Sequence, residues 1–317
     1  MKKNQAHPSV SVLVSLYNFE ESVDALHASL VDVMTGDPAS YELIFVDDGS
    51  TDGTFEKLKV IADGDDRVRV VKMRSMFGEA AALDAGLKNS RGDRIVYLTG
   101  RVRIHPAGIP DCLRRLEEGA DFVVGWRHPR RDALINRWIS WCFNCMANRL
   151  SRTRLHDINS GILATHRSVF ERISFYGDLY NFIPVLASQQ GYRVEEVKVE
   201  QLPGAFRTSR YPKEYLQRLL DIITVFFLSR YSKKPIHFLG FVGTLFIIAG
   251  LGIELYLFVY RILLIGPIAG RPLLVLGALL LVIGIQMISI GLLGEMIIFT
   301  HAGEIQEYNV EETINQP

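Results

Sequence analysis

Two adjacent carboxylates early in the chain have the types and spacing of a nucleotide site. Asp47 and Asp48 follow the apolar run Tyr41–Val46 and precede Gly49 and Ser50. Carboxylate oxygens accept hydrogen bonds from a base or a ribose and also bind hard cations, and the amides of such a turn favour anions. Because Asp-Gly is also an ordinary turn signal, these residues alone are moderately specific.

Arginines follow two later segments of the chain. Arg101 and Arg103 come shortly after the segment Arg94–Leu98, which is apolar after its first residue. A basic run extends from Arg127 to Arg131. A guanidinium group is a fork-shaped cation that binds phosphate oxygens without a metal. The basic run has two interpretations, a phosphate site that faces a membrane or a solvated charged patch.

The elements that must position these residues alternate along the chain. The predicted strands are Ser11–Leu16, Tyr41–Val46, Val68–Lys72 and Arg94–Leu98, and the predicted helices are 20–33, 51–62 and 79–88. This alternation predicts an α/β fold with a mostly parallel sheet and helices on both faces. Ligands of such sheets bind at the carboxyl ends of strands, where Asp47 and Asp48 would lie.

Two long apolar segments follow in the last part of the chain. Ile236–Ile262 carries Glu254 and Arg261 as its only charges, and Leu273–Phe299 carries only Glu295. Each exceeds the ~20 apolar residues that a helix needs to cross a membrane. We therefore expect a transmembrane helical hairpin. A carboxylate at the depth of Glu254 is costly unless it faces protein or water, so it marks a helix or subunit contact or pairs with Arg261.

The charge pattern around the hairpin predicts its orientation. Arg230, Lys233 and Lys234 precede the first apolar segment, whereas the loop between the segments offers Arg261 and Arg271. This excess favours a cytosolic head, and two crossings return the acidic tail to the same side.

Composition excludes two other classes of protein. The 35 basic and 35 acidic residues cancel, so no general attraction to nucleic acid is expected. Three cysteines give no regular disulfide framework, and the polar residues 1–9 lack the apolar core of a secretion signal.

Two segments between the predicted sheet and the hairpin combine aromatic and basic residues. They are Ala133–Leu150 and Tyr215–Tyr231. This composition suits amphipathic helices at the membrane interface, and it equally suits amphipathic helices packed on the sheet.

Taken together, the motifs resemble the inverting family-2 glycosyltransferases with a GT-A, Rossmann-like fold. The segments that carry the resemblance are Val12–Glu21, Ile44–Thr54, Arg74–Gly86, Arg91–Asp93, His156-Asp157, Ser160-Gly161, 177–179, 191–192 and 209–211. With the apolar tail, they are similar to the polyprenyl-phosphate glycosyltransferases of that family. The likeness covers roughly residues 9–300.

The resemblance implies transfer of a sugar from a nucleotide diphosphate to a polyprenyl phosphate at the membrane face. It implies that Asp47 and Asp48 hold the nucleotide, with Tyr17 and Asn18 nearby, and Arg74 is a further candidate for this contact. It also implies that Asp157 lies near the reacting centre as a catalytic candidate. The acceptor phosphate would lie near Arg130, Arg131, Ser209, Arg210 and Tyr211.

The chain departs from the family at the Asp-x-Asp motif, whose carboxylates bind the divalent metal on the diphosphate. Thr99, Gly100 and Arg101 take these positions. Mg2+ depends on hard oxygen ligands, so a Mg2+ or Mn2+ site would be weakened, and no cofactor is assigned. Arg101, as a catalytic candidate, and Arg103 would instead meet the diphosphate directly.

Three accounts stay open at this point. The first is a transferase that works without a metal. The second is a transferase whose metal is held by Asp48, another carboxylate and the nucleotide. The third is a non-catalytic relative that binds nucleotide or lipid and serves as a scaffold.

We expect four regions in the chain. Residues 1–132 form the nucleotide-sugar half of the head and 133–234 the acceptor half with the interfacial helices, 235–300 form the two membrane helices, and 301–317 form a tail. The expected location is the inner (plasma) membrane with the head and both termini in the cytosol. A homo-oligomer through the membrane helices is also expected.

Overall fold

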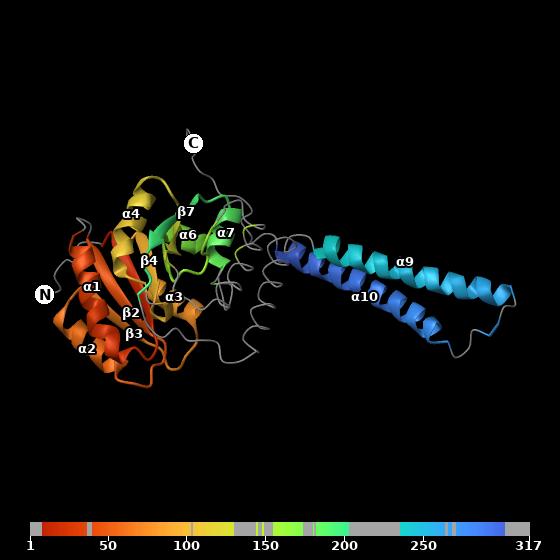
Figure 1. The fold of residues 1–317 in the computed structure, drawn as a ribbon, viewed down its shortest axis with the longest axis horizontal. Helices are drawn as coiled ribbons and strands as arrows, with labels where there is room; N and C mark the ends of the chain where they lie inside the picture. The colour runs from red at the N-terminus through yellow and green to blue at the C-terminus, as the bar shows by residue number, and fades with distance from the viewer. Residues whose placement is uncertain are drawn as a thin grey trace. The chain divides into compact units, whose positions relative to one another are not determined.

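The protein forms two compact units, residues 1–225 and 226–317 (Figure 1). The computed structural model describes residues 8–36, 40–102, 104–129, 144, 148, 155–173, 180, 182–202, 235–263, 266–267 and 271–301. The predicted helices 133–150 and 215–231 lie outside the described residues, apart from Asn144 and Asn148, which are helical.

The first unit is built on a seven-stranded sheet with the order β3-β2-β1-β4-β6-β5-β7. Its strands are β1 (Val10–Leu16), β2 (Tyr41–Asp47), β3 (Val68–Lys72), β4 (Arg94–Thr99), β5 (Phe122–Arg127), β6 (Ile162–His166) and β7 (Val194–Val199). Of these seven, β6 alone runs against its neighbours β4 and β5, and the other pairs are parallel. The predicted mostly parallel sheet is therefore confirmed, and strands from both predicted halves of the head share it.

Helices cover both faces of this sheet, as predicted. They are α1 (Val23–Thr35), α2 (Thr54–Gly64), α3 (Glu79–Lys88), α4 (Ile109–Glu117), α6 (Arg167–Arg172) and α7 (Ile183–Gln189). Helices α1, α2 and α4 pack on one face, and α3, α6 and α7 pack on the other. All seven residues of β1 are buried because a central strand is covered on both sides.

Local sequence patterns account for these elements. In α4, Ile109, Cys112, Leu113 and Leu116 have the spacing of one helix face and are all buried, whereas charged residues take most of the other positions. The four predicted strands and the three predicted helices of residues 11–98 are present, and helix 79–88 has the predicted bounds. The predicted helix 51–62 begins later, at Thr54, because the turn after β2 occupies the first positions.

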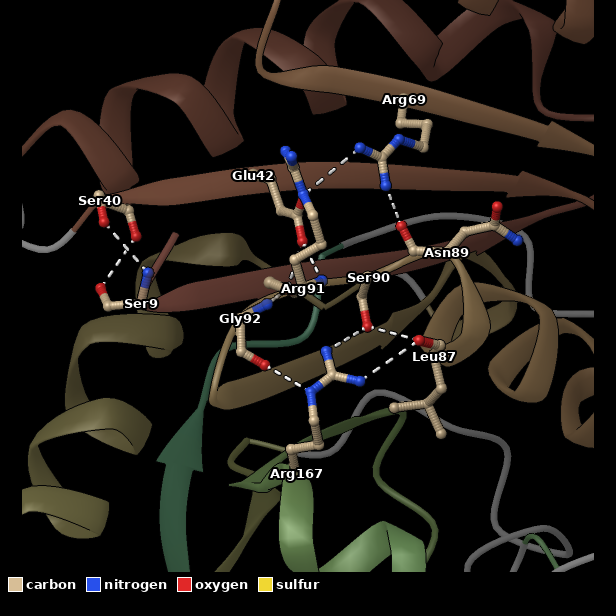
Figure 2. Close-up of polar contacts among 11 residues, drawn as sticks. Ser9, Ser40, Glu42, Arg69, Leu87, Asn89, Ser90, Arg91, Gly92 and Arg167 are labelled. Atoms are coloured by element: carbon tan, nitrogen blue, oxygen red, sulfur yellow. Dashed lines mark hydrogen bonds and ion pairs between the residues drawn. The ribbon is translucent and has the colours of Figure 1, made fainter. Parts of the chain in front are cut away.

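A polar network holds the loop before β4 against the amino ends of the strands (Figure 2). The buried Glu42 accepts hydrogen bonds from the Ser11 hydroxyl at 2.7 Å and the Arg91 amide at 2.6 Å. From α6, Arg167 donates to the carbonyl of Gly92 at 2.8 Å and to the Ser90 hydroxyl at 2.7 Å. These bonds lie at the edge of the sheet opposite the carboxyl ends, so we interpret them as structural.

The second unit contains α9 (Pro235–Ile262) and α10 (Pro272–His301), which pack on each other as a hairpin. Both are long and apolar enough to cross a membrane. Glycines bring the two backbones close together. A Cβ atom at Gly243 would lie 2.6 Å from the carbonyl oxygen of Gly284, and one at Gly250 would lie 2.9 Å from that of Gly277.

Polar side chains lie at two points of the hairpin. Near the loop, Arg271 donates to the Tyr260 hydroxyl at 2.8 Å and to the Pro267 carbonyl at 2.9 Å. Glu254 packs against Gly277 of the neighbouring helix, and its buried Oε1 atom has no hydrogen-bond partner among the described residues. This packing agrees with one of the alternatives for Glu254, a contact between the two helices.

Candidate functional site

The carboxyl ends of the parallel strands meet at one edge of the sheet. Residues Leu16 and Asp47 are paired across β1 and β2, and Ser15 and Thr99 are paired across β1 and β4. The chain runs from β1 through β2 to β3 on one side, and the connection from β3 to β4 returns to the other side of β1. The β1–β4 boundary is therefore the switch point where open α/β sheets bind ligands. We call this edge the carboxyl edge.

The turn after β2 brings both predicted acids to this edge. Asp47 is fully buried, and its Oδ1 atom accepts a hydrogen bond from the Ser50 amide at 3.1 Å. Its other oxygen, Oδ2, is buried without a partner among the described residues. A buried acceptor with no donor is unfavourable, so Oδ2 is suited to receive a ligand donor after a small movement.

The turn after β1 is tied to the turn after β2. Asn18 has a positive φ of 48°, and its side-chain oxygen accepts the Thr51 amide at 2.8 Å. The Asn18 amide donates to the Ser50 hydroxyl at 2.9 Å. Tyr17 is 40% exposed beside it. The structure therefore brings Tyr17 and Asn18 next to the acids, with Asn18 acting as a bridge between turns and Tyr17 open to solvent.

Asp48 holds the loop between β3 and α3. Its two oxygens accept the amides of Phe77 at 2.7 Å and Gly78 at 2.9 Å. The loop passes so close to the turn that a Cβ atom at Gly49, where φ is 74°, would lie 2.4 Å from the backbone of Ser75. Arg74, on the same loop, is exposed. Asp48 thus holds the loop that carries Arg74 close to the Asp47 turn.

The Glu79 carboxylate binds three buried hydroxyls at the switch point. Glu79, in the first turn of α3, accepts the Thr99 hydroxyl at 2.6 Å on Oε1 and the Ser15 hydroxyl at 2.7 Å on Oε2. The Tyr97 hydroxyl also donates to Oε2. We call these four residues the Glu79 cluster. Burial, helped by the nearby Glu79 carboxylate, raises the pKa of Tyr97 well above its ordinary value, so this hydroxyl keeps its proton and remains a donor.

Sequence reasoning assigned no site role to Glu79. An acid at the start of a helix is common because it suits the helix dipole, so its place in the sequence gave no sign of a second role. Arg101 lies in the short 3-10 turn η2 (Gly100–Val102) directly after β4, which puts its backbone at the carboxyl edge.

Asp157 is at the same edge and forms a buried ion pair with Arg127 at the end of β5. Arg127 donates from Nε to Oδ2 at 2.6 Å and from Nη2 to Oδ1 at 2.9 Å. The two side chains are 8% and 3% exposed. A carboxylate bound by two nitrogens of one guanidinium group has a fixed orientation. This geometry suits a positioning role better than a base role.

Side chains from two other segments form hydrogen bonds with the backbone around Asp157. Glu196 of β7 accepts the amides of His156 at 2.5 Å and Asp157 at 3.1 Å. Asn144 donates to the carbonyl of His156 at 2.6 Å, and Asn148 exchanges two hydrogen bonds with the backbone of Leu155 at 2.7 and 2.8 Å. The i, i+4 spacing of the asparagines puts both on one helix face. Sequence reasoning missed these three residues, because nothing local pairs them with residues 155–157.

The remaining predicted site residues lie outside the described residues. These are Arg103, Arg130, Arg131, Ser209, Arg210 and Tyr211. Their predicted contacts with the diphosphate and the acceptor phosphate stay predictions.

Comparison with known proteins decides the family. The sequence profile of Glycosyl transferase family 2 matches residues 11–176, which is more than half of the chain. This protein belongs to glycosyltransferase family 2. The resemblance predicted from the motifs is therefore confirmed, and so is the expectation of a glycosyltransferase.

Two curated relatives of this family 2 glycosyltransferase cover nearly all of it. The dodecaprenyl-phosphate galacturonate synthase of Rhizobium johnstonii is 34% identical over 303 residues, 92% of this chain and 88% of the relative. The undecaprenyl-phosphate 4-deoxy-4-formamido-L-arabinose transferase of Pseudomonas paraeruginosa is 32% identical over 289 residues, 90% of this chain and 84% of the relative.

Solved structures support the GT-A fold of the glycosyltransferase. The glucosyl-3-phosphoglycerate synthase of Mycobacterium tuberculosis, crystallised with Mn2+ and UDP-glucose, superimposes with a TM-score of 0.53. The alignment covers 71% of this chain and 80% of that chain at 21% identity, so it bears on the fold alone.

The divalent metal implied by the family does not fit the described residues of this glycosyltransferase. Thr99 stands where the first acid of Asp-x-Asp is expected, and the Asp48 and Glu79 carboxylates are bonded to protein donors. No three His, Cys, Asp or Glu side chains converge on a metal site among the residues that the structure describes. Mg2+ on a diphosphate takes one or two protein carboxylates beside phosphate and water oxygens, and both of these carboxylates already accept protein donors.

Proposed function

We propose that this glycosyltransferase moves a sugar, with inversion, from a nucleotide-diphosphate sugar to a polyprenyl phosphate in the membrane. The observation that carries the proposal is the combination, in one chain, of a ligand-binding carboxyl edge and two apolar helices of membrane-spanning length. The names of the two curated relatives, which act on dodecaprenyl and undecaprenyl phosphate, support the same acceptor class.

The chemistry of the acceptor explains what the protein must supply. A phosphate monoester has a second pKa near ~6, so it is largely dianionic at neutral pH. Its oxygen can form the bond to the anomeric carbon while the bond from that carbon to the diphosphate breaks, and the nucleoside diphosphate leaves with the electron pair. No proton has to be removed from the nucleophile. The protein therefore needs to position both anions and stabilise the leaving group.

The described residues can be assigned to these tasks. Asp47 and the exposed Tyr17 would contact the nucleotide, and Asp48 would hold the loop carrying Arg74 at the same site. Asp157, oriented by Arg127, would face the reacting centre as a positioning residue. Arg101 and Arg103 would meet the diphosphate. The lipid phosphate would be bound by residues that lie outside the described ones, namely Arg130, Arg131, Ser209, Arg210 and Tyr211.

The test is a transfer assay on the full-length protein in lipid nanodiscs that contain undecaprenyl phosphate. The donors would include nucleotide-activated galacturonate and 4-deoxy-4-formamido-L-arabinose, the sugars named in the two relatives. We expect a lipid-linked sugar phosphate of inverted configuration from one donor of the panel. Protein that is folded yet produces no lipid-linked sugar from any donor would refute the proposal.

We further propose that the head and both chain ends face the cytosol, that the hairpin crosses the inner membrane twice, and that the protein self-associates through these helices. Three basic residues just before α9 support the orientation. The unpartnered Glu254 oxygen supports a contact within the membrane.

A C-terminal tag should resist a membrane-impermeant label in intact cells, and labelling from outside would contradict the orientation. Cross-linking between differently tagged copies tests self-association.

A further inference from the structure

The donor site of this protein has one acid in an unusual place. At the switch point between β1 and β4, the family motif would put carboxylates on the strand end, and this chain has Thr99 there instead. A carboxylate reaches this position from α3, where Glu79 accepts the Thr99 hydroxyl at 2.6 Å. The acid therefore belongs to a helix and not to the strand end.

The partners of Glu79 make it unavailable to an ion. Ser15, Tyr97 and Thr99 are 4%, 0% and 3% exposed, so their hydroxyls have no access to bulk water. All three donate to the one carboxylate. If Glu79 turned toward a metal, the buried Ser15, Tyr97 and Thr99 hydroxyls would lose the carboxylate that they share, which is unfavourable. The hydrogen bonds also connect α3 to the ends of β1 and β4.

The other nearby carboxylates, Asp47 and Asp48, are also hydrogen-bonded or buried within the protein. Both oxygens of Asp48 accept backbone amides, and releasing them would free the loop between β3 and α3. The unpartnered oxygen of Asp47 is a single ligand, and it is buried. A Mg2+ on a diphosphate usually takes one or two protein carboxylates beside phosphate and water oxygens. Here Asp47 could offer one buried oxygen in place of the two acids of the family motif.

We propose that this glycosyltransferase binds its donor diphosphate without a divalent cation, because the Glu79 cluster occupies the place of the family's metal site. This inference rests on the proposed function and deepens it. Charge compensation for the leaving diphosphate then falls to arginine, and Arg101, in the turn directly after Thr99 and Gly100, is the nearest candidate along the chain.

The first test uses the wild-type, full-length protein in nanodiscs. We expect donor affinity, measured by calorimetry, and the transfer rate to be the same in excess chelator and in excess Mg2+. We also expect electron paramagnetic resonance to detect no Mn2+ bound to the protein beyond what the nucleotide binds by itself. A chelator-sensitive affinity or a protein-bound Mn2+ signal would overturn the inference.

The second test restores the family's acids. The variant Glu79→Gln/Thr99→Asp/Arg101→Asp removes the competing carboxylate and places acids at both motif positions, so we expect it to bind Mn2+ in the presence of nucleotide. The control Glu79→Gln/Thr99→Asn/Arg101→Asn has nearly the same shapes without the charges, and we expect no binding. A folded acid variant that fails to gain Mn2+ would contradict the role of the cluster. If these variants do not fold, the wild-type measurements still decide.

The two proposals fail in different ways. No transfer from any donor, together with metal-free binding of nucleotide, would refute the transfer reaction and leave the inference intact. Transfer that requires Mg2+ would refute the inference and leave the reaction intact. An absence of nucleotide binding under both conditions would overturn the inference as well.

Discussion

Asp157 and Arg127 are buried together, so each neutralises the other in the interior of the protein. Removing one partner of a buried pair is strongly destabilising, whereas replacing both partners by apolar residues is often neutral for stability. Stability and function can therefore be separated at this pair.

We predict that Asp157→Ala lowers the free energy of unfolding by about 3–5 kcal/mol. The double variant Arg127→Met/Asp157→Leu should recover most of that stability and remain inactive in transfer, because the oriented carboxylate is absent. Thermal unfolding and the transfer assay on both variants check this. Recovery of transfer in the double variant would mean that the pair is only structural.

Glu42 offers a structural comparison at the opposite edge of the sheet (Figure 2). Glu42→Ala removes the acceptor of the Ser11 hydroxyl and the Arg91 amide. We predict a loss of about 1–3 kcal/mol in the free energy of unfolding, since the buried Ser11 hydroxyl loses an acceptor. Donor affinity measured by calorimetry should be unchanged. A large fall in affinity without a loss of stability would contradict the structural interpretation of this network.

Among the elements, the hairpin depends on glycine at the positions where α9 and α10 touch. The Gly243–Gly284 and Gly250–Gly277 contacts leave no space for a side chain. Close approach of backbones through small residues is a main source of helix association in membranes, because lipid and side chains are equally apolar.

Gly243→Leu should separate the helices and lower the stability of the hairpin by about 1–3 kcal/mol, since a side chain would overlap the Gly284 carbonyl. Gly252→Leu is the matched control, because no atom lies within 4 Å of a Cβ atom there. The measurement is the fraction of detergent-solubilised protein that stays soluble after heating. Equal losses in the two variants would argue against tight glycine packing.

For the whole molecule, the division into two units predicts that donor binding and lipid access can be separated. A fragment of residues 1–225 should bind the nucleotide sugar like the full chain, because the carboxyl edge belongs to the first unit. Transfer to undecaprenyl phosphate in vesicles should fall by about 100-fold or more, since the acceptor is no longer held at high effective concentration. With a short, water-soluble prenyl phosphate, fragment and full chain should be equally active. A fragment that keeps full activity on vesicles would show that the hairpin is dispensable.

The order of strands and helices, the two apolar helices and the place of the acidic turn could be predicted from the sequence, because each depends on local periodicity or on the length of an apolar run. The 3.6-residue pattern of α4 and the alternation of strand and helix segments can be read directly in the sequence. Family membership followed from the order of short motifs.

The hydrogen-bond partners at the site were decided only by the tertiary structure. Ser15, Glu79 and Thr99 are far apart in sequence, and they meet because β1 lies beside β4 in a register that pairs Ser15 with Thr99. Arg127 reaches Asp157 because β5 and β6 are neighbours. Strand order and register depend on how the two faces of the sheet pack against their helices, and no local pattern specifies them. The residues that could act were therefore visible in the sequence, and which of them are already bound to one another was not.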